Sequence, residues 1–260
     1  MQENLINVVK IGGNVIDNPD ALAAFLKDFA AMKGAKILVH GGGKEATRMS
    51  KSMGIEATMI DGRRVTDRQT LDIVTMVYAG LINKRITAQL QALGCDAVGL
   101  TGADGCVIPA KRRDPNPIDY GYVGDIDAAK VNDKFIATLL SNGNVPVFCA
   151  ICYDGHGGLL NCNADSVAGA VAAGAARIAP TRLTFCFEKP GVMLDVDDDD
   201  SVIPLVTAES FEQLKRDGIV AKGMLPKITN ALASADAGVT EVRICKAEAL
   251  NGEGGTIIRK

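Results

Sequence analysis

Short apolar runs alternate with segments of helical periodicity along almost the whole chain, and this alternation limits the possible folds more than any other feature. An apolar run bounded by turn residues is typical of a buried strand, and a longer amphipathic stretch is typical of a helix. Parallel strands need crossover connections, so this alternation predicts a parallel sheet covered by helices on both faces. Strands are expected at 5–11, 36–40, 96–100, 145–151, within 177–188, at 241–244 and at 256–259, and helices at 20–32, 44–53, 66–93 (one long or two shorter), 131–142, 163–174, 207–217 and 225–237.

The size and composition suit one large or two small globular domains with a substantial core. The chain has 260 residues, of which 47% are hydrophobic, and a formal net charge of −3. Because that charge is small and negative, electrostatics does not favour nucleic acid or an anionic membrane as a partner. The sequence contains no run of about 18 apolar residues, so a membrane span is not predicted. Residues 1–7 lack the pattern of a signal peptide.

Seven cysteines are scattered along the chain. A scattered, odd-numbered set is typical of reduced, buried thiols in a cytoplasmic protein. Cys149 and Cys152 form a C-x-x-C motif, but their segment, VPVFCAICYDG, has the pattern of a strand. A redox or metal site would need a helix start or a second ligand pair there, so a structural role is predicted.

Two glycine-rich turns follow separate predicted strands, KIGGN at 10–14 and VHGGGKE at 39–45, and a third, TGADG, lies at 101–105. Such turns let backbone N–H groups approach an anion, and the helix that follows adds its positive dipole. The carboxyl ends of parallel strands share one edge of the sheet, where open α/β proteins bind ligands. One such turn would simply connect a strand to a helix, but two of them, one beginning with Lys10, favour a phosphate site.

The standard nucleotide fingerprints are missing. No G-x-x-x-x-G-K-[ST] motif occurs, and no G-x-G-x-x-G follows a strand. Lys44 does not have the P-loop spacing and is expected to be a surface lysine in the first turn of a helix. The acidic run DVDDDDS at 195–201 is expected to be a solvated loop rather than a metal site.

Polar side chains alternate in LLNCNADSVAG at 159–169, just before an Ala-rich helix. Asn163 or Asp165 is suited to cap that helix, but capping needs only one of them, so Asn161, Asn163 and Asp165 together indicate a polar site. In GMLPKITNA, Lys227 follows a proline at a helix start, where a cation opposes the helix dipole. A lysine at this unfavourable position indicates an anionic partner.

Two arginines lie just ahead of a helix in DGRRVTD, at 61–67. An arginine there can bind a carboxylate with two parallel hydrogen bonds. The alternative is a solvated arginine pair, which applies more to Arg63 than to Arg64. Thr66 and Gln69 fit a capping box, which would start the helix at Thr66.

These motifs occur as an ordered set that also includes GYVGDI. From Val8 to Arg259 the set resembles the amino acid kinase family, and GRRVT and NCNAD resemble its acylglutamate branch, the N-acetyl-L-glutamate kinases. The resemblance implies an α/β fold, an open three-layer αβα sandwich around a mainly parallel central sheet. It implies a single domain over 1–260, with an N-terminal lobe of about 1–175 that binds the acyl amino acid and a C-terminal lobe of about 176–260 that binds ATP.

The reaction that the resemblance implies is ATP-dependent phosphorylation of the γ-carboxylate of N-acetyl-L-glutamate, a step of arginine biosynthesis. Lys10 and Lys227 would neutralise the transferring phosphoryl group, and Asp165 would hold both lysines by ion pairing. Mg²⁺ would bridge the ATP phosphates, with no metal ligand from the protein. The resemblance also assigns backbone N–H groups as donors, those of Gly12 and Gly13 to phosphate and those of Gly42 and Gly43 to the substrate. It implies that Arg64 binds the α-carboxylate of the substrate and Asn161 its acylated amine, with Asn163 close by.

One part of the expected nucleotide site departs from the family pattern. Relatives carry Ser/Thr–Asp before PGV, whereas this chain has CFEKPGVM at 186–193. Phe187 either packs against the adenine base or belongs to the core, and Lys222 either reaches an ATP phosphate or is an exposed loop lysine. The expected nucleotide-binding residues are Gly12, Gly13, Phe187, Glu188, Lys189, Gly191, Lys222, Gly223 and Met224.

These departures leave the acyl group open. N-succinyl-L-glutamate is an alternative substrate, and its extra carboxylate would need another cation, for which Arg63 and Lys44 are candidates. Another acyl amino acid, such as an α-aminoadipate derivative, is a second alternative. A third is a non-catalytic amino-acid sensor on the same fold, although a sensor has no need of the predicted lysine–aspartate clamp.

The resemblance also implies an oligomeric state. Arginine-inhibited relatives carry an extra N-terminal helix that joins dimers into a hexamer, whereas few residues precede the first strand here. We therefore expect a cytoplasmic homodimer without strong arginine feedback. It would act on small molecules, with neither nucleic acid nor a membrane as a partner.

Overall fold

A mainly parallel sheet of eight strands forms the centre of the computed structural model, which describes residues 4–195, 197–220, 224–252 and 254–260. The strand order is β12-β14-β13-β11-β1-β2-β8-β5, and neighbouring strands are parallel except β13 and β14. The predicted parallel sheet is therefore confirmed. Its strands are β1 (Ile6–Ile11), β2 (Lys36–His40), β5 (Ala97–Leu100), β8 (Val145–Phe148), β11 (Thr181–Phe187), β12 (Leu205–Val206), β13 (Glu241–Lys246) and β14 (Thr256–Ile258).

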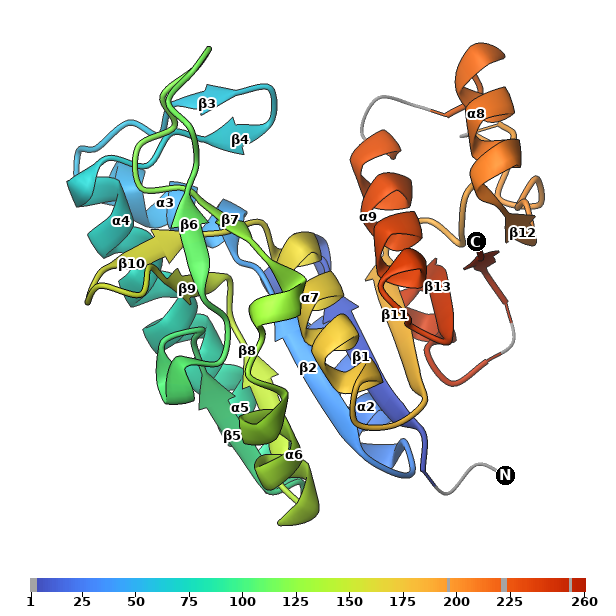
Figure 1. Ribbon diagram of the computed structural model, residues 1–260, viewed down its shortest axis with the longest axis horizontal. Helices are drawn as coiled ribbons and strands as arrows, with labels where there is room; N and C mark the ends of the chain where they lie inside the picture. The colour runs from blue at the N-terminus through green and yellow to red at the C-terminus, as the bar shows by residue number, and fades with distance from the viewer. Residues whose placement is uncertain (1–3, 196, 221–223, 253) are drawn as a thin grey trace.

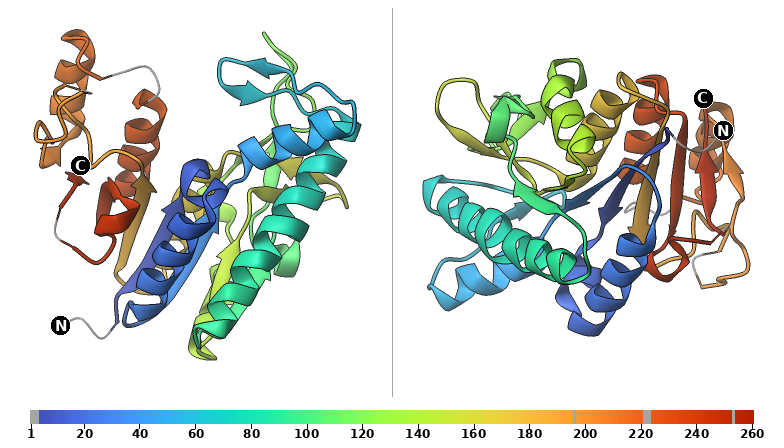
Figure 2. Two further views of the ribbon diagram at one scale, coloured as in Figure 1. Left: turned by 180° about the vertical axis from the view of Figure 1, so that it is seen from behind. Right: turned by 90° about the horizontal axis from the view of Figure 1, so that it is seen from below.

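Helices cover both faces of this sheet, which gives the predicted αβα layers (Figures 1 and 2). On one face lie α6 (Asp133–Ser141), α7 (Ala164–Ala176) and α9 (Leu225–Asp236), and on the other lie α2 (Pro19–Ala31) and α5 (Asn83–Ala92). None of the helices in the described ranges is long and apolar enough to span a membrane. The remaining helices are α1 (Gly13–Asp17), α3 (Gly43–Ser52), α4 (Arg68–Thr75) and α8 (Ala208–Arg216), and short 3₁₀ turns lie at Asp104–Cys106, Ala128–Lys130 and Ala247–Ala249.

Three antiparallel hairpins lie over the carboxyl ends of the parallel strands (Figure 1). They pair β3 (Met59–Ile60) with β4 (Arg63–Arg64), β6 (Ala110–Arg112) with β7 (Gly124–Ile126), and β9 (Ile151–Tyr153) with β10 (Leu159–Asn161). The single strand predicted at 145–151 is wrong in detail, because the chain leaves the sheet after Phe148 and re-enters a hairpin at Ile151.

The predicted helix at 66–93 is one continuous stretch, but its start and middle differ from expectation. Asp67 caps it by accepting a hydrogen bond from the N–H of Thr70 at 2.8 Å, so the capping box at Thr66 is wrong. A π-helical segment, Met76–Ile82, joins α4 to α5. Its extra residue per turn places two side chains against Gly42, because a Cβ at Gly42 would lie 2.3 Å from Ile82 Cδ1 and 2.9 Å from Tyr78 Cδ1.

All seven cysteines are free thiols, and six of them are buried. Cys149 and Cys152 are fully buried, and burial raises the pKa of Cys149 to about 12. A thiol with this pKa stays protonated and unreactive near neutral pH. The structural interpretation of the C-x-x-C motif therefore holds.

His40 ends β2 immediately before the second glycine-rich turn and is fully buried. Its Nδ1 lies 2.8 Å from the carbonyl oxygen of Gly41, and its Nε2 lies 3.0 Å from Nδ2 of Asn83, which also donates to the carbonyl of Val147. Both contacts are satisfied when neutral His40 donates through Nδ1 and accepts through Nε2. Burial accordingly lowers the pKa of His40 from 6.5 to about 4.

This pKa predicts an acid-sensitive contribution to stability. The unfolded chain binds a proton at His40 below pH 6.5, whereas the folded chain does not until about pH 4, so the free energy of unfolding should fall as the pH drops through that window. The full effect is roughly 3 kcal/mol. Urea unfolding at several pH values should show a steeper loss for the wild type than for His40→Asn, which shares all other titrating groups. Equal slopes would show that His40 does not carry the effect.

Candidate active site

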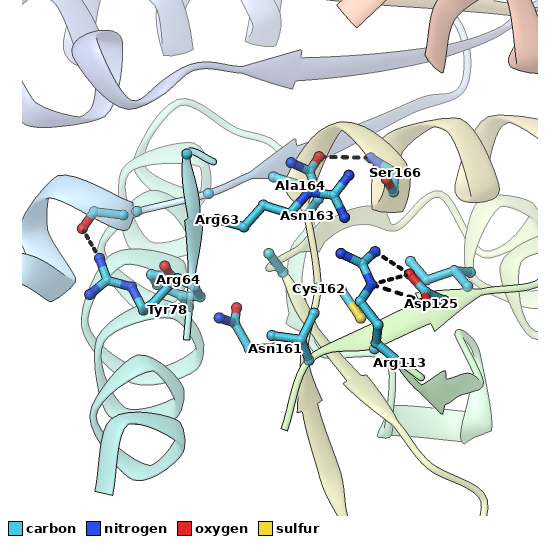
Figure 3. A pocket seen from close by; sticks show the side chains of 18 of the residues that line it. Arg63, Arg64, Tyr78, Arg113, Asp125, Asn161, Cys162, Asn163, Ala164 and Ser166 are labelled. Carbon is cyan, nitrogen blue, oxygen red and sulfur yellow. Dashed lines mark hydrogen bonds and ion pairs between the residues drawn. The ribbon is translucent and has the colours of Figure 1, made fainter. Parts of the chain in front are cut away.

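A cavity of about 360 Å³ lies at the carboxyl ends of β2 and β8, beneath the hairpins (Figure 3). Its walls come from the second glycine-rich turn, from β4, from the β6–β7 hairpin and from the start of α7. The structure thus brings together segments that are more than a hundred positions apart in the sequence. All five predicted substrate-binding residues line this cavity, namely Gly42, Gly43, Arg64, Asn161 and Asn163.

Arg64 is held by one end of its guanidinium group. Nη2 donates to the carbonyl oxygen of Gly43 at 2.9 Å and to Oγ1 of Thr47 at 2.6 Å. Nη1 is buried and has no hydrogen-bond partner among the described residues. An unpaired buried donor is costly, and a guanidinium group can bind an anion of carboxylate geometry.

Asn161 and Arg64 are linked through Thr66, the residue that sequence reasoning had assigned to a helix cap. Nδ2 of Asn161 donates to Oγ1 of Thr66 at 3.0 Å, and this hydroxyl donates to the carbonyl of Arg64 at 3.1 Å. The fully buried Thr66 therefore connects β10 to β4 and fixes two cavity walls relative to each other.

Asn163 combines the two roles that the sequence left open. Its Oδ1 accepts hydrogen bonds from the N–H groups of Asp165 at 2.8 Å and Ser166 at 3.2 Å, so it is the N-cap of α7. The same residue lines the cavity. Capping sets the direction of the first turn of α7 and thereby the position of Asp165.

Lys10, Asp165 and Lys227 gather beside this cavity. Nζ of Lys10 lies 2.6 Å from Oδ1 of Asp165, and both side chains are largely buried, with 9% and 13% exposed. Asp165 stands between Ala164 and Ser166, which both line the cavity. Lys227 makes no ion pair with the described residues, so Asp165 pairs directly with Lys10 alone, in contrast to the predicted double pairing.

Lys227 is partly buried in the first turn of α9, as the sequence predicted. Burial lowers its pKa, the carboxylate of Asp165 raises it, and the charge of Lys10 lowers it again. Both ammonium groups lie over one aromatic ring, that of Phe187, at 3.5 Å from its centroid for Lys227 Nζ and 5.3 Å for Lys10 Nζ. Two lysines far apart in the sequence therefore converge at one point.

Comparison with known sequences identifies the family to which this site belongs. The profile of the amino acid kinase family matches residues 6–246. This chain belongs to the amino acid kinase family. An acetylglutamate kinase from Phocaeicola vulgatus is 48% identical over 260 residues, which is 100% of both chains. Another, from Cytophaga hutchinsonii, is 52% identical over 244 residues, 94% of this chain and 92% of that one.

Solved structures show the same fold. The N-acetylglutamate synthase of Neisseria gonorrhoeae, in complex with coenzyme A and N-acetyl-glutamate, superposes with a TM-score of 0.81. The superposition covers 99% of this amino acid kinase and 59% of that chain, at 20% identity. The resemblance inferred from the motifs is therefore confirmed at the level of family and fold.

The glycine turns of this amino acid kinase differ in the amides that they offer. The N–H of Gly12 already donates to the carbonyl of Cys186 at 3.2 Å, whereas Gly13 opens α1. Gly42 has φ of 155°, a conformation that favours glycine, and its neighbours leave no room for a Cβ. Gly43 then opens α3 at the cavity wall.

The predicted nucleotide segment has mixed surroundings. Glu188 is exposed, and Lys189 pairs with Asp199 at 3.6 Å. Gly191 is buried where a Cβ would lie 2.6 Å from Oγ1 of Thr256, so packing alone explains this glycine. Met224 is the N-cap of α9, and Lys222 and Gly223 lie outside the described residues.

Sequence reasoning missed an arginine in the cavity of this amino acid kinase. Arg113 lines the cavity, and Asp125 holds it through contacts of 3.1 Å from Nε to both carboxylate oxygens and a further bond from Nη2 (Figure 3). Arg63 also lines the cavity and extends toward Asn163 (Figure 3). The Nζ of Lys44, in contrast, donates to Oδ1 of Asn14.

No three His, Cys, Asp or Glu side chains of the described ranges group in a way that could hold a metal ion.

Proposed function

We propose that this amino acid kinase transfers the γ-phosphoryl group of ATP to the γ-carboxylate of N-acetyl-L-glutamate. The observation that carries the proposal is the convergence of Lys10 and Lys227 beside the cavity that Arg64 lines. A phosphoryl donor and a carboxylate acceptor need these two kinds of cationic group, side by side. The names of the full-length relatives agree with this substrate.

In the proposed complex, the α-carboxylate of the substrate binds Arg64, and Asn161 and Asn163 face its acylated amine. The γ-carboxylate then lies toward Lys10 and Lys227. One of its oxygens attacks the γ-phosphorus, the bond from that phosphorus to the β–γ bridging oxygen breaks, and ADP leaves with the electron pair. Because a carboxylate is already ionised at neutral pH, the step needs no general base.

The protein's contribution in this mechanism is position and charge. Two ammonium groups stabilise the negative charge that spreads over the transferring group, and the amides of Gly13 and Gly43 add dipoles from helix starts. Asp165 keeps Lys10 in place at 2.6 Å. Mg²⁺ bound with ATP would supply further positive charge, and the described residues offer it no cluster of protein ligands.

We further propose the division of labour that the resemblance implies. Residues up to about 175 would bind the acyl amino acid, since all residues that line the 360 Å³ cavity lie between positions 41 and 166. The remainder would bind ATP near the carboxyl end of β11 and the start of α9. The homodimer and the cytoplasmic location belong to the same proposal. Free thiols at all seven cysteines suit a reducing compartment, and sedimentation velocity tests the dimer.

The names of the full-length relatives do not favour N-succinyl-L-glutamate, the alternative acceptor, but the charge of the cavity makes it worth testing. Arg63 and Arg113 line the same cavity as Arg64, and Asp125 is the only acid in that lining. N-acetyl-L-glutamate brings one carboxylate to this cavity once its γ-carboxylate faces the lysines. A succinyl group would bring a second, and Arg63, one of the two cations suggested by the sequence, is placed to meet it, whereas Lys44 does not line the cavity.

A panel of acceptors tests the proposed function. ADP release should require N-acetyl-L-glutamate and should be absent with free L-glutamate and weak with an α-aminoadipate derivative, since each changes a contact in the cavity. N-succinyl-L-glutamate, measured beside the acetyl compound, decides between the two acyl groups. Binding of these compounds without any ADP release would contradict the kinase proposal and support a sensor.

A further inference from the structure

The ring of Phe187 lies within reach of both lysines. Phe187 is the last residue of β11 and is 7% exposed. Nζ of Lys227 lies 3.5 Å from the ring centroid, and Nζ of Lys10 lies 5.3 Å from it. The ring also borders the first glycine turn, because a Cβ at Gly12 would lie 3.9 Å from its Cδ1. Phe187 therefore touches the parts of the site that the proposed reaction uses for charge.

Lys227 has few other groups to hold it. Lys10 has the carboxylate of Asp165 at 2.6 Å, but Lys227 forms no ion pair within the described part of the chain. The carboxylates of Asp165 on α7 and Glu188 after β11 attract Lys227, whereas the ammonium group of Lys10 on β1 repels it. The negative face of an aromatic ring attracts an ammonium group at this distance, most strongly where water is excluded.

Two simpler roles for Phe187 make different predictions. A residue that only fills the core would behave like Phe185, which lies two positions earlier in β11 with its ring nearly parallel, at 6.2 Å between centroids and an angle of 3°. A residue that stacks on the adenine base would need a free ring face. Nζ of Lys227 occupies one face of the ring. An adenine base could not stack on that face without displacing the lysine, and a residue that only fills the core would not need this contact.

We propose that Phe187 is a positioning residue, whose ring holds the ammonium group of Lys227, and more weakly that of Lys10, where phosphoryl transfer needs them. This rests on the proposed function, since it assigns Phe187 to the same site. In this role Phe187 acts through the lysines rather than on a substrate.

Three variants separate the proposal from core packing. Phe187→Leu removes the ring at similar volume, and Phe187→Tyr restores a ring. Phe185→Leu is the matched control on the same strand, because Phe185 is 1% exposed and its ring has no cation–π contact with a lysine among the described residues. We expect Phe187→Leu to lower kcat about tenfold, with KM for the acylglutamate within about twofold of wild type. Phe187→Tyr should recover most of kcat, and Phe185→Leu should lose stability but keep kcat.

A second readout does not depend on turnover. In protein labelled with ¹³C-lysine, the ε-carbon signal of Lys227, identified by its loss in Lys227→Arg, reports the titration of this amine. Phe187→Leu should lower the pKa of Lys227 relative to wild type, because the ring stabilises the charged form, and Phe187→Tyr should return it. Asp165, Lys10 and Glu188 are the same in all these proteins.

The two readouts distinguish failure of this inference from failure of the proposed function. If no acylglutamate is phosphorylated by the wild type, the kinase proposal fails, and the titration still tests the ring. If the wild type is active but Phe187→Leu leaves both kcat and the Lys227 pKa unchanged, or raises that pKa, Phe187 is not a positioning residue. A loss in Phe187→Tyr equal to that in Phe187→Leu would assign the residue to core packing instead.

Discussion

Replacing Lys227 with alanine is expected to lower kcat by about 10²–10³-fold, the size of effect seen when one preorganised electrostatic donor is removed. The reason is geometric. Lys227 and Lys10 meet over one ring beside the cavity, and both would face the transferring phosphoryl group. Removing either ammonium group leaves part of the developing charge without a partner. Steady-state kcat at saturating ATP and acceptor measures the effect directly.

The same substitution should change stability little, and this separates it from ordinary damage to the fold. Lys227 lies in the first turn of α9, where a cation opposes the helix dipole, and it has no ion pair among the described residues. Removing such a cation from a helix start is worth about 0.3–1 kcal/mol in favour of folding. The lost attraction of the Phe187 ring, about 0.5–2 kcal/mol, acts in the opposite direction, so the melting temperature of Lys227→Ala should stay close to that of the wild type.

Lys10→Ala provides the comparison. It should lose a similar factor in kcat, but it should also lose stability, because it leaves the largely buried carboxylate of Asp165 without its partner at 2.6 Å. Near-normal turnover in both variants would contradict the assignment of the two lysines. Equal losses of stability in both would contradict the different environments described here.

The central sheet could be predicted from sequence because its signal is local. All six residues of β1 and all five of β2 are buried, so each strand appears in the sequence as a mostly apolar run with only two polar residues. Lys10 stood out for the same reason, as a lysine within such a run followed by two glycines. A charge at that place has a low cost only if something at the sheet edge pairs with it, and Asp165 does so.

The hairpins could not be predicted in the same way. Strands of two residues, such as β3 and β4, carry no periodicity, and their pairing is set by the turn and by what they cover. Thr66 and Asp67 are both good N-cap residues, and only a contact from a distant segment decides between them. Thr66 bonds to Asn161, 95 positions later, which leaves Asp67 to cap the helix.

Arg113 and Phe187 show where sequence reasoning ended. Arg113 lies in a Gly- and Pro-rich stretch with an arginine on one side and an aspartate on the other, so nothing local distinguishes it from a solvated charge. Its role depends on the β6–β7 hairpin, which brings Asp125 beside it and turns both toward the cavity. Phe187 was expected either at the base or in the core, and only the positions of two distant lysines revealed the contact that it makes.

Replacing Arg64 with alanine is expected to lower kcat/KM for the acyl amino acid by about 10²–10³-fold, because truncating one partner of a buried charge pair leaves the other charge uncompensated. Most of the loss should appear as a higher KM, since the α-carboxylate is bound alike in the ground state and the transition state. KM for ATP should stay near the wild-type value. Steady-state kinetics with each substrate varied in turn separates these terms.

Arg64→Lys tests whether charge alone suffices. The fork of Arg64 holds Gly43 and Thr47 with one nitrogen and leaves the other, Nη1, for the ligand. A lysine ammonium group is a single point of charge and cannot hold Gly43 and Thr47 while also binding a carboxylate, so this variant should also bind the acceptor poorly. Arg48→Lys is the matched control, because Arg48 is exposed on α3, where it pairs with Glu45. If Arg64→Lys retained the wild-type KM for the acceptor, a single positive charge would be enough, and the planar guanidinium group of Arg64 would not be needed to bind the carboxylate.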